Sequence, residues 1–225
     1  MSDFKQTPQW HMGRRGEILQ LATFTRFGFS LIDVGGSSNA KAPLLHRYEF
    51  SFVAPDAMAF KTGAVWMQFK TKSRHQEWRG GSINDATKIP PRFEEGIDRK
   101  DYEGHLAVER ETNIPVVLAV LAIQQGELLA NTFRGLGEPR RSNHPDYDLV
   151  NWPIWKFRRL ATFDVRRLRR YFVHPDGKPR EAPADVPSQQ QLRQTLDWLR
   201  PVQGEFDLIM ADIVAQIERD WHTSR

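Results

Sequence analysis

An acid, an amide and an amine stand in and beside an apolar stretch of the sequence. Asp56 follows Pro55, and Gln68 and Lys70 alternate with apolar residues in the segment AVWMQFK. Alternation with a period of two places Gln68 and Lys70 on the same face of a strand. A hard divalent cation takes oxygen ligands, and an ammonium group beside it holds an attacking water or a developing phosphorane charge. This combination is typical of metal-assisted phosphodiester hydrolysis.

A hairpin is the element that would bring these side chains together. The segment 56–60 leads through the turn Lys61-Thr62-Gly63 into the segment 64–70, and both segments have the composition of strands. We therefore expect Asp56, at the start of the first strand, to reach the face of the second strand that carries Gln68 and Lys70.

The remaining elements indicate an α/β chain. A helix is expected over 14–27, closed by Gly28 in a left-handed conformation, and another over 98–112 with Tyr102 and Leu106 directed inward. The run IPVVLAVLAI is apolar on both faces, as a central parallel strand requires. Further strands are expected over 31–34, 47–53 and 127–133, and the polar segment 73–96 is expected to be a long excursion outside the core.

The C-terminal part of the chain follows a linker-like segment rich in proline and charge, 174–188. We expect a core over residues 11–173 and a small helical C-terminal element over 188–225. Its two helices carry one apolar stripe, which fits a dimer contact and packing within the chain equally well. The stripe consists of Leu192, Leu196, Leu199, Phe206, Ile209, Ile213, Ile217 and Trp221.

The motif and the order of elements resemble a known nuclease superfamily. Pro55-Asp56 followed by Gln68-Phe69-Lys70, with Gly16-Glu17 opening the preceding helix, is similar to the PD-(D/E)xK signature. The resemblance covers roughly residues 13–133. It implies the restriction-endonuclease-like fold, a central mixed sheet flanked by helices, which is also found in Holliday-junction resolvases.

The resemblance also implies roles for individual residues. Asp56 would bind Mg²⁺ or Mn²⁺ with help from the Phe69 carbonyl, Lys70 would orient the nucleophile, and Glu17 would contact the metal or its water. Gln68 stands where the signature has a carboxylate, and its amide oxygen can bind a cation without adding negative charge. The same QxK variant is found in Mrr-type restriction enzymes and related defence-associated families.

Two basic clusters are candidates for contact with nucleic acid. The first follows the proposed centre and consists of Lys72, Arg74 and Arg79. The second lies in the segment 155–172, where aromatic residues are interleaved with Arg166, Arg167, Arg169 and Arg170. A solvated face of an ordinary amphipathic helix explains these arginines equally well, and Phe163 and Phe172 are expected in the core.

Composition limits the remaining functions. The chain has no cysteine, which excludes disulfides and thiolate chemistry, and its net charge is a modest +4. No segment reads as a signal peptide or a membrane span, so a cytoplasmic location is expected. The seven histidines show no paired metal-ligand spacing, although His75 is close to Lys70 in the sequence.

These observations predict a metal-dependent DNA endonuclease that acts in defence, recombination or mobile-element processing. An alternative is a nucleic-acid-binding or assembly protein that keeps this fold without catalysis, because Gln68 has removed a charge from the metal site. A third reading is an unrelated α/β enzyme acting on small molecules, for which a deep apolar pocket around Asp56 is expected.

Overall fold

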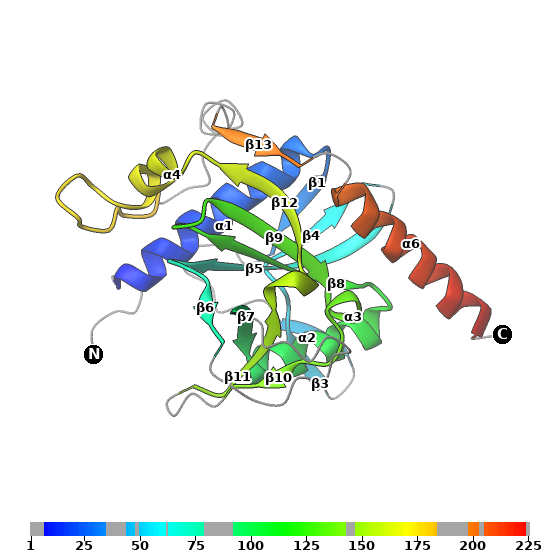
Figure 1. The fold of residues 1–225 in the computed structure, drawn as a ribbon. Helices are drawn as coiled ribbons and strands as arrows, with labels where there is room; N and C mark the ends of the chain where they lie inside the picture. Colours follow the sequence, from blue (N-terminus) through cyan, green and yellow to red (C-terminus); the bar gives the residue numbers. More distant parts are fainter. Residues whose placement is uncertain are drawn as a thin grey trace.

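A computed structural model describes residues 7–34, 44–47, 50–61, 63–78, 92–142, 147–183, 198–202 and 205–223. Its centre is a mixed sheet of seven strands in the order β1-β4-β5-β8-β9-β12-β13 (Figure 1). Only the β5–β8 pair is parallel, and the other neighbours are antiparallel. The strands are β1 (Ser30–Asp33), β4 (Ala57–Phe60), β5 (Ala64–Lys72), β8 (Val116–Ala122), β9 (Glu127–Thr132), β12 (Arg158–Phe163) and β13 (Leu199–Pro201).

Both faces of this sheet are covered, and each cover forms one buried apolar cluster. The first cluster joins the sheet to α1 (Pro8–Arg26), α4 (Val165–Phe172) and α6 (Glu205–Thr223). The second joins it to α2 (Arg99–Thr112), α3 (Phe133–Leu136) and a smaller sheet, which gather in the lower half of Figure 1. The expected fold class, a mixed sheet flanked by helices, is confirmed.

The smaller sheet is antiparallel and has the order β10-β11-β7-β6. Its strands are β10 (Arg140–Arg141), β11 (Leu149–Pro153), β7 (Phe93–Asp98) and β6 (Gln76–Glu77). The described chain also contains the hairpin β2 (Leu44–Arg47) and β3 (Phe50–Val53) and the 3₁₀ turn η2 (Ile154–Lys156). The order α1–β1–β4–β5–α2–β8 is the order of elements on which the resemblance rests.

Helix α1 begins earlier than the sequence predicted. Thr7 caps its first turn by accepting a hydrogen bond from the Trp10 backbone N–H, and Pro8 occupies the first position, where its missing N–H costs nothing. The predicted start at residue 14 is therefore wrong by more than one turn. The predicted end is confirmed, because Gly28 has a left-handed φ of 86° just beyond the helix.

The expectation that residues 73–96 lie outside the core is wrong for β7, whereas in β6 Gln76 is half-buried and Glu77 is exposed. Glu94 and Glu95 are fully buried in β7, where Glu94 pairs with Arg140 and Glu95 with His75. Charged residues are rarely buried unless they are paired, so the two glutamates made this strand read as a polar loop. Their partners could not be recognised from the sequence. Residues 79–91 of this segment lie outside the described residues.

Two further predictions need correction. In α2 it is His105 and Val108 that are buried, whereas Leu106 is 37% exposed. Tyr102 does pack inward, edge-on against Phe133 and Trp152. The basic segment 155–172 is a strand followed by a helix, β12 and α4, and its Phe163 and Phe172 are buried as predicted.

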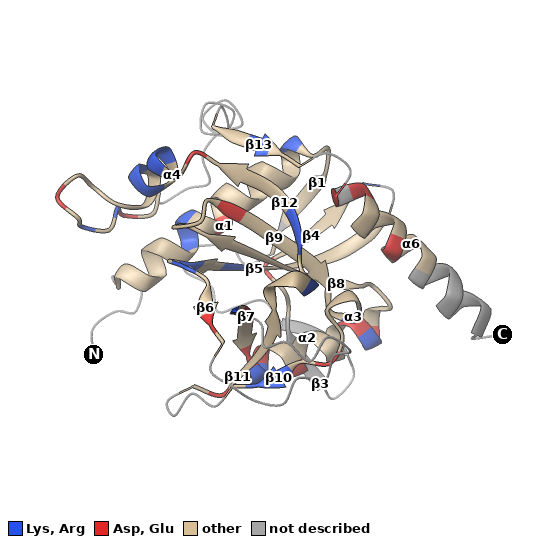
Figure 2. Cartoon of the chain, in the orientation of Figure 1, with Lys and Arg blue, Asp and Glu red and all other residues tan. Residues whose placement is uncertain are grey.

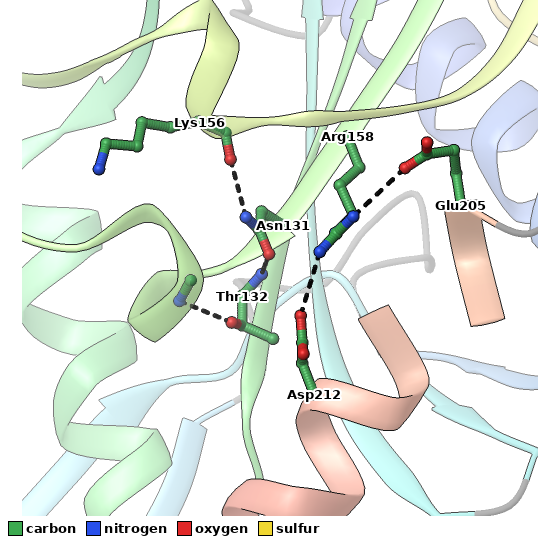
Figure 3. A network of polar contacts seen from close by, with 7 residues as sticks. Asn131, Thr132, Lys156, Arg158, Glu205 and Asp212 are labelled. Atoms are coloured by element: carbon green, nitrogen blue, oxygen red, sulfur yellow. Dashed lines mark hydrogen bonds and ion pairs between the residues drawn. The ribbon is translucent and has the colours of Figure 1, made fainter. Parts of the chain in front are cut away.

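The C-terminal residues pack on the same core as the rest of the chain. Leu199 lies in strand β13 and not in a helix, whereas α6 is helical as predicted and buries Ile209 and Ile213. Leu192 and Leu196 lie outside the described residues. Arg158 on β12 contacts Glu205 at 3.5 Å and Asp212 at 3.4 Å on α6, which ties the helix to the sheet (Figure 3).

Candidate active site

The candidate site lies where β5 loses its partner on one side. β4 pairs with β5 only from Ala64 to Met67, whereas the pairing with β8 continues to Lys72. Beyond Met67, β4 therefore no longer pairs with the edge of β5 that faces away from β8, and side chains can bind to the backbone there. Backbone groups in a sheet interior require partners, and here the side chain of Asp56, just before β4, pairs with the Phe69 N–H.

Asp56 and Gln68 meet at this edge, as the hairpin predicted. The Asp56 Oδ2 atom accepts hydrogen bonds from the Gln68 Nε2 and the Phe69 backbone N–H, both at 2.7 Å. The Gln68 Nε2 also donates to the Phe69 carbonyl oxygen at 3.3 Å. The Gln68 amide nitrogen thus stands between the two oxygens, of Asp56 and Phe69, that the resemblance assigns to a metal.

The charge of Asp56 is poorly compensated in this structure. Burial and, secondly, the negative charge of Glu17 raise the pKa of the Asp56 carboxyl to about 7. The hydrogen bond from Phe69 and the positive charge of Lys70 act in the opposite direction, and Asp101 adds to the rise. A cation at this point would favour the ionised form of Asp56.

Lys70 contacts Asp101, a partner that the sequence did not predict. Its Nζ atom lies 3.0 Å from Oδ2 of Asp101, in the first turn of α2. Both side chains are partly exposed, Lys70 to 24% and Asp101 to 40%. The only sequence signal for Asp101 was an acid near a helix start, which the helix dipole favours whatever its function.

Helix α1 packs against β5 and carries Glu17 and Gln20. Gln20 is buried and donates its Nε2 to the backbone carbonyl of Lys70 at 3.4 Å. Glu17 pairs with Arg14 at 3.0 Å and keeps 30% of its side chain exposed. The negative charge of Glu17 is the second cause that raises the pKa of Asp56, so Glu17 acts on this carboxyl from a separate element.

The close approach of α1 to β5 depends on Gly16. A Cβ atom at this position would lie 2.7 Å from Cβ and 2.8 Å from Cγ2 of Thr71, too close for any rotamer of Thr71 to relieve. We expect Gly16→Ala to lower the free energy of unfolding by about 1–3 kcal/mol, as overpacking does. Urea unfolding measures this effect.

Gly13 provides the matched control on the same helix. A Cβ atom there would meet nothing within 4 Å, so Gly13→Ala should gain up to about 1 kcal/mol from the higher helix propensity of alanine. Equal unfolding midpoints for the two variants would contradict the packing of α1 on Thr71.

The donors at the site suit a hard divalent cation. Asp56, Glu17, the Gln68 amide oxygen and the Phe69 carbonyl are all oxygen ligands, which Mg²⁺ and Mn²⁺ prefer. Within the described residues, His, Asp and Glu side chains form no group of three arranged to hold a metal. A cation here would thus depend on the amide and carbonyl oxygens, and Gln68 would have to turn its amide to present Oε1.

The predicted DNA-contacting residues fall into two groups with different exposure. Arg74 is exposed, whereas Lys72 is half-buried. Burial lowers the pKa of Lys72, and the negative charge of Glu95 offsets only part of this effect. Arg79 lies outside the described residues. Figure 2 shows the colour of basic residues on much of α4. All four predicted arginines of this helix are exposed: Arg166, Arg167, Arg169 and Arg170.

A hollow with a volume of about 260 Å³ lies beside α4. Arg169 of α4 lines it, together with Ser73 and several apolar side chains. α4 is in turn fixed to α1, because Arg15 donates to the Tyr171 carbonyl at 2.7 Å and its guanidinium lies 4.2 Å from the centre of the Tyr171 ring. The basic helix α4 is thus attached to α1 through Arg15, two residues before Glu17.

His75 does not join the candidate site. Its Nδ1 lies 2.7 Å from Glu95 and its Nε2 3.2 Å from Glu127, so both ring nitrogens are used. Burial alone would lower the pKa of His75, but the two carboxylates outweigh burial and raise it. The side chain therefore links the loop after β5 to β7 and β9 as a buried ion cluster.

None of the described helices combines the length and apolar character needed to cross a membrane. No protein-family model matches the chain, and no curated protein matches it. Among solved structures, the chain is similar to Hjc of Archaeoglobus fulgidus, a Holliday junction resolvase from an archaeal hyperthermophile, at 13% identity and a TM-score of 0.42. The similarity covers 64% of this chain and 91% of that chain. At this level of similarity, a functional conclusion has to come from the side chains of the site.

Proposed function

We propose that this chain is a metal-dependent endonuclease of the PD-(D/E)xK type that hydrolyses DNA phosphodiester bonds. The observation that carries the proposal is the convergence at the free edge of β5. There the Asp56 carboxylate and the Phe69 carbonyl face one point, with Lys70 one residue further along the strand. If Asp56, Gln68 and Lys70 served only local structure, nothing would require their side chains to meet at one place.

Each residue has a distinct part in the proposed reaction. Asp56, Glu17, the Gln68 amide oxygen and the Phe69 carbonyl would hold Mg²⁺ or Mn²⁺. When bound, the cation supplies charge stabilisation at the scissile phosphate and lowers the pKa of a water. The Lys70 ammonium orients the attacking water or neutralises charge that develops on the phosphoryl oxygens.

The DNA would lie over the two basic clusters. Arg74 and the four arginines of α4 are exposed, which supports contact of both clusters with phosphates. Guanidinium groups suit phosphate because they offer two parallel donors, so α4 is the stronger part of this surface. A chain of this kind fits the processing of DNA in defence, recombination or mobile elements.

One observation favours the rival, a DNA-binding protein without catalysis. Gln68 donates to Asp56 and so occupies, with a neutral amide, the place that a cation would take. If this contact persists in the presence of metal ions, the fold would serve binding or assembly alone.

A metal titration on Gln68→Glu separates the two functions. The new carboxylate would stand where the amide now contacts Asp56 Oδ2, so without metal the two charges repel and stability at neutral pH should fall. Added Mn²⁺ should restore the stability of Gln68→Glu. Its Kd for Mn²⁺ should be lower than that of the parent, by about tenfold for each 1.4 kcal/mol of added attraction. Calorimetry with Mn²⁺ measures the affinity, and thermal unfolding with and without Mn²⁺ measures the rescue.

Glu77→Gln is the control, because Glu77 is exposed on β6. Its Mn²⁺ affinity should equal that of the parent. Absence of Mn²⁺ binding in both the parent and Gln68→Glu would favour the non-catalytic rival.

A further inference from the structure

The Lys70 ammonium is held by a residue outside the PD-(D/E)xK motif. Asp101 contacts it at 3.0 Å from α2, a helix that packs on the face of the sheet opposite to α1. A lysine side chain has four rotatable bonds, and an ammonium that must act at one point gains from a fixed anionic partner. The contact therefore bears directly on the group proposed to orient the nucleophile.

The start of α2 is fixed, so that Asp101 is presented from a rigid element. The Arg99 backbone N–H donates to the Asp148 carbonyl, and its Nε donates to the Asp148 side chain, both at 2.8 Å. Two turns beyond Asp101, Val108 is buried in the second apolar cluster. Asp101 thus stands in the first turn of a helix anchored at its start and along its length.

The histidine on the same helix does not compete with Lys70 for Asp101. His105 lies one turn further along α2 and is buried, and burial lowers its pKa to about 4, so its ring is neutral at physiological pH. Asp101 also acts on Asp56, since its negative charge follows burial and Glu17 among the causes that raise the pKa of that carboxyl. Asp101 therefore adds negative charge around the motif, where Gln68 adds none.

We propose that Asp101 is a positioning residue of this site, which fixes the Lys70 ammonium beside Asp56 and supplies from α2 the negative charge that Gln68 lacks. This inference rests on the proposed function. It assigns to the motif a further carboxylate from a helix that the signature does not include.

Asp101→Asn tests the inference with little change in shape. With supercoiled plasmid and a synthetic four-way junction as probes, kcat should fall roughly 10- to 100-fold, as when groups that orient a catalytic residue are lost, while KM stays unchanged. Mn²⁺ affinity measured by calorimetry should weaken as well. Asp101→Glu keeps the charge and should recover part of both losses.

A labelling experiment reads the contact without any cleavage assay. An amine-reactive ester should modify Lys70 several-fold faster in Asp101→Asn than in the parent, with the 81% exposed Lys178 as internal reference. Glu103→Gln is the matched control, because Glu103 is 61% exposed on the same helix and pairs with Arg99 instead. It should leave kcat, Mn²⁺ affinity and Lys70 labelling unchanged.

The outcomes separate this inference from the proposed function. Unchanged or raised kcat, with unchanged labelling of Lys70, in Asp101→Asn would overturn the role of Asp101. If Asp56→Asn cleaves DNA as fast as the parent, the nuclease assignment itself is wrong, whatever the labelling shows.

Discussion

Asp56→Asn should reduce metal-dependent DNA cleavage on the order of 10³-fold, the largest effect expected of any single change in this chain. A bound metal contributes several kcal/mol of charge stabilisation, and each 1.4 kcal/mol corresponds to a factor of ten in rate. Asparagine keeps an oxygen for the Phe69 N–H but removes the charge that holds the cation. Lys70→Ala should reduce cleavage strongly as well, because it removes the ammonium that would orient the attacking water.

The fold should survive the loss of this carboxylate. Because burial and Glu17 raise the pKa of Asp56 to about 7, its ionised form is disfavoured in the folded protein. Asp56→Asn should therefore be at least as stable as the parent at neutral pH, as measured by urea unfolding. Asp176→Asn, in an exposed turn after α4, is the control and should cleave normally. Parental cleavage by both Asp56→Asn and Lys70→Ala would refute the assignment.

His75→Ala should lower the free energy of unfolding by about 3–5 kcal/mol, the cost of removing one partner from a buried ion pair. The substitution leaves Glu95, which is fully buried, without its contact at 2.7 Å. It also removes the contact of Glu127, although Glu127 keeps Arg159 at 2.9 Å. Urea unfolding measures the loss, and His174→Ala, at an exposed position, should be nearly neutral.

The same cluster makes stability depend on pH with a definite sign. The pKa of His75 is raised in the folded protein above its ordinary value, so the folded state binds the proton more tightly than the unfolded state. This contribution is fully present below about pH 6.5, the ordinary value for histidine, and is lost as the pH rises through the raised pKa. The parent should lose stability over that window and His75→Ala should not. Parallel stability curves for the two proteins would contradict the cluster.

The pairing of Asp56 with Gln68 was predictable because it depends on short-range geometry. A turn at Lys61–Gly63 fixes which strands pair, and a period of two fixes which side chains share a face. The apolar run of β8 marked the central strand for the same reason, since a strand buried on both faces has little room for polar residues. These parts of the fold follow from local pattern alone.

The parts that sequence reasoning missed depend on contacts between distant segments. Strand β7 read as a loop because its glutamates find their partners, His75 and Arg140, far away in the chain. Asp101 is 31 residues from Lys70, and nothing in its own helix distinguishes it from an ordinary acid near a helix start. The Gln68 amide as donor to Asp56 could not be foreseen either, because an amide offers both a donor and an acceptor.

The pairing of β5, complete with β8 but partial with β4, also determines how rigid the backbone of the candidate site is. On the β8 side, residues Trp66 to Lys72 pair with Val116 to Ala122 in the centre of the sheet, so the backbone at Gln68 and Lys70 can shift only if the middle of the molecule opens. Central strands open at free energies near that of global unfolding, which makes their amides the slowest to exchange with deuterium. The backbone that carries Gln68 and Lys70 therefore keeps its place over long times, and any rearrangement at the candidate site is left to the side chains and to the surrounding segments.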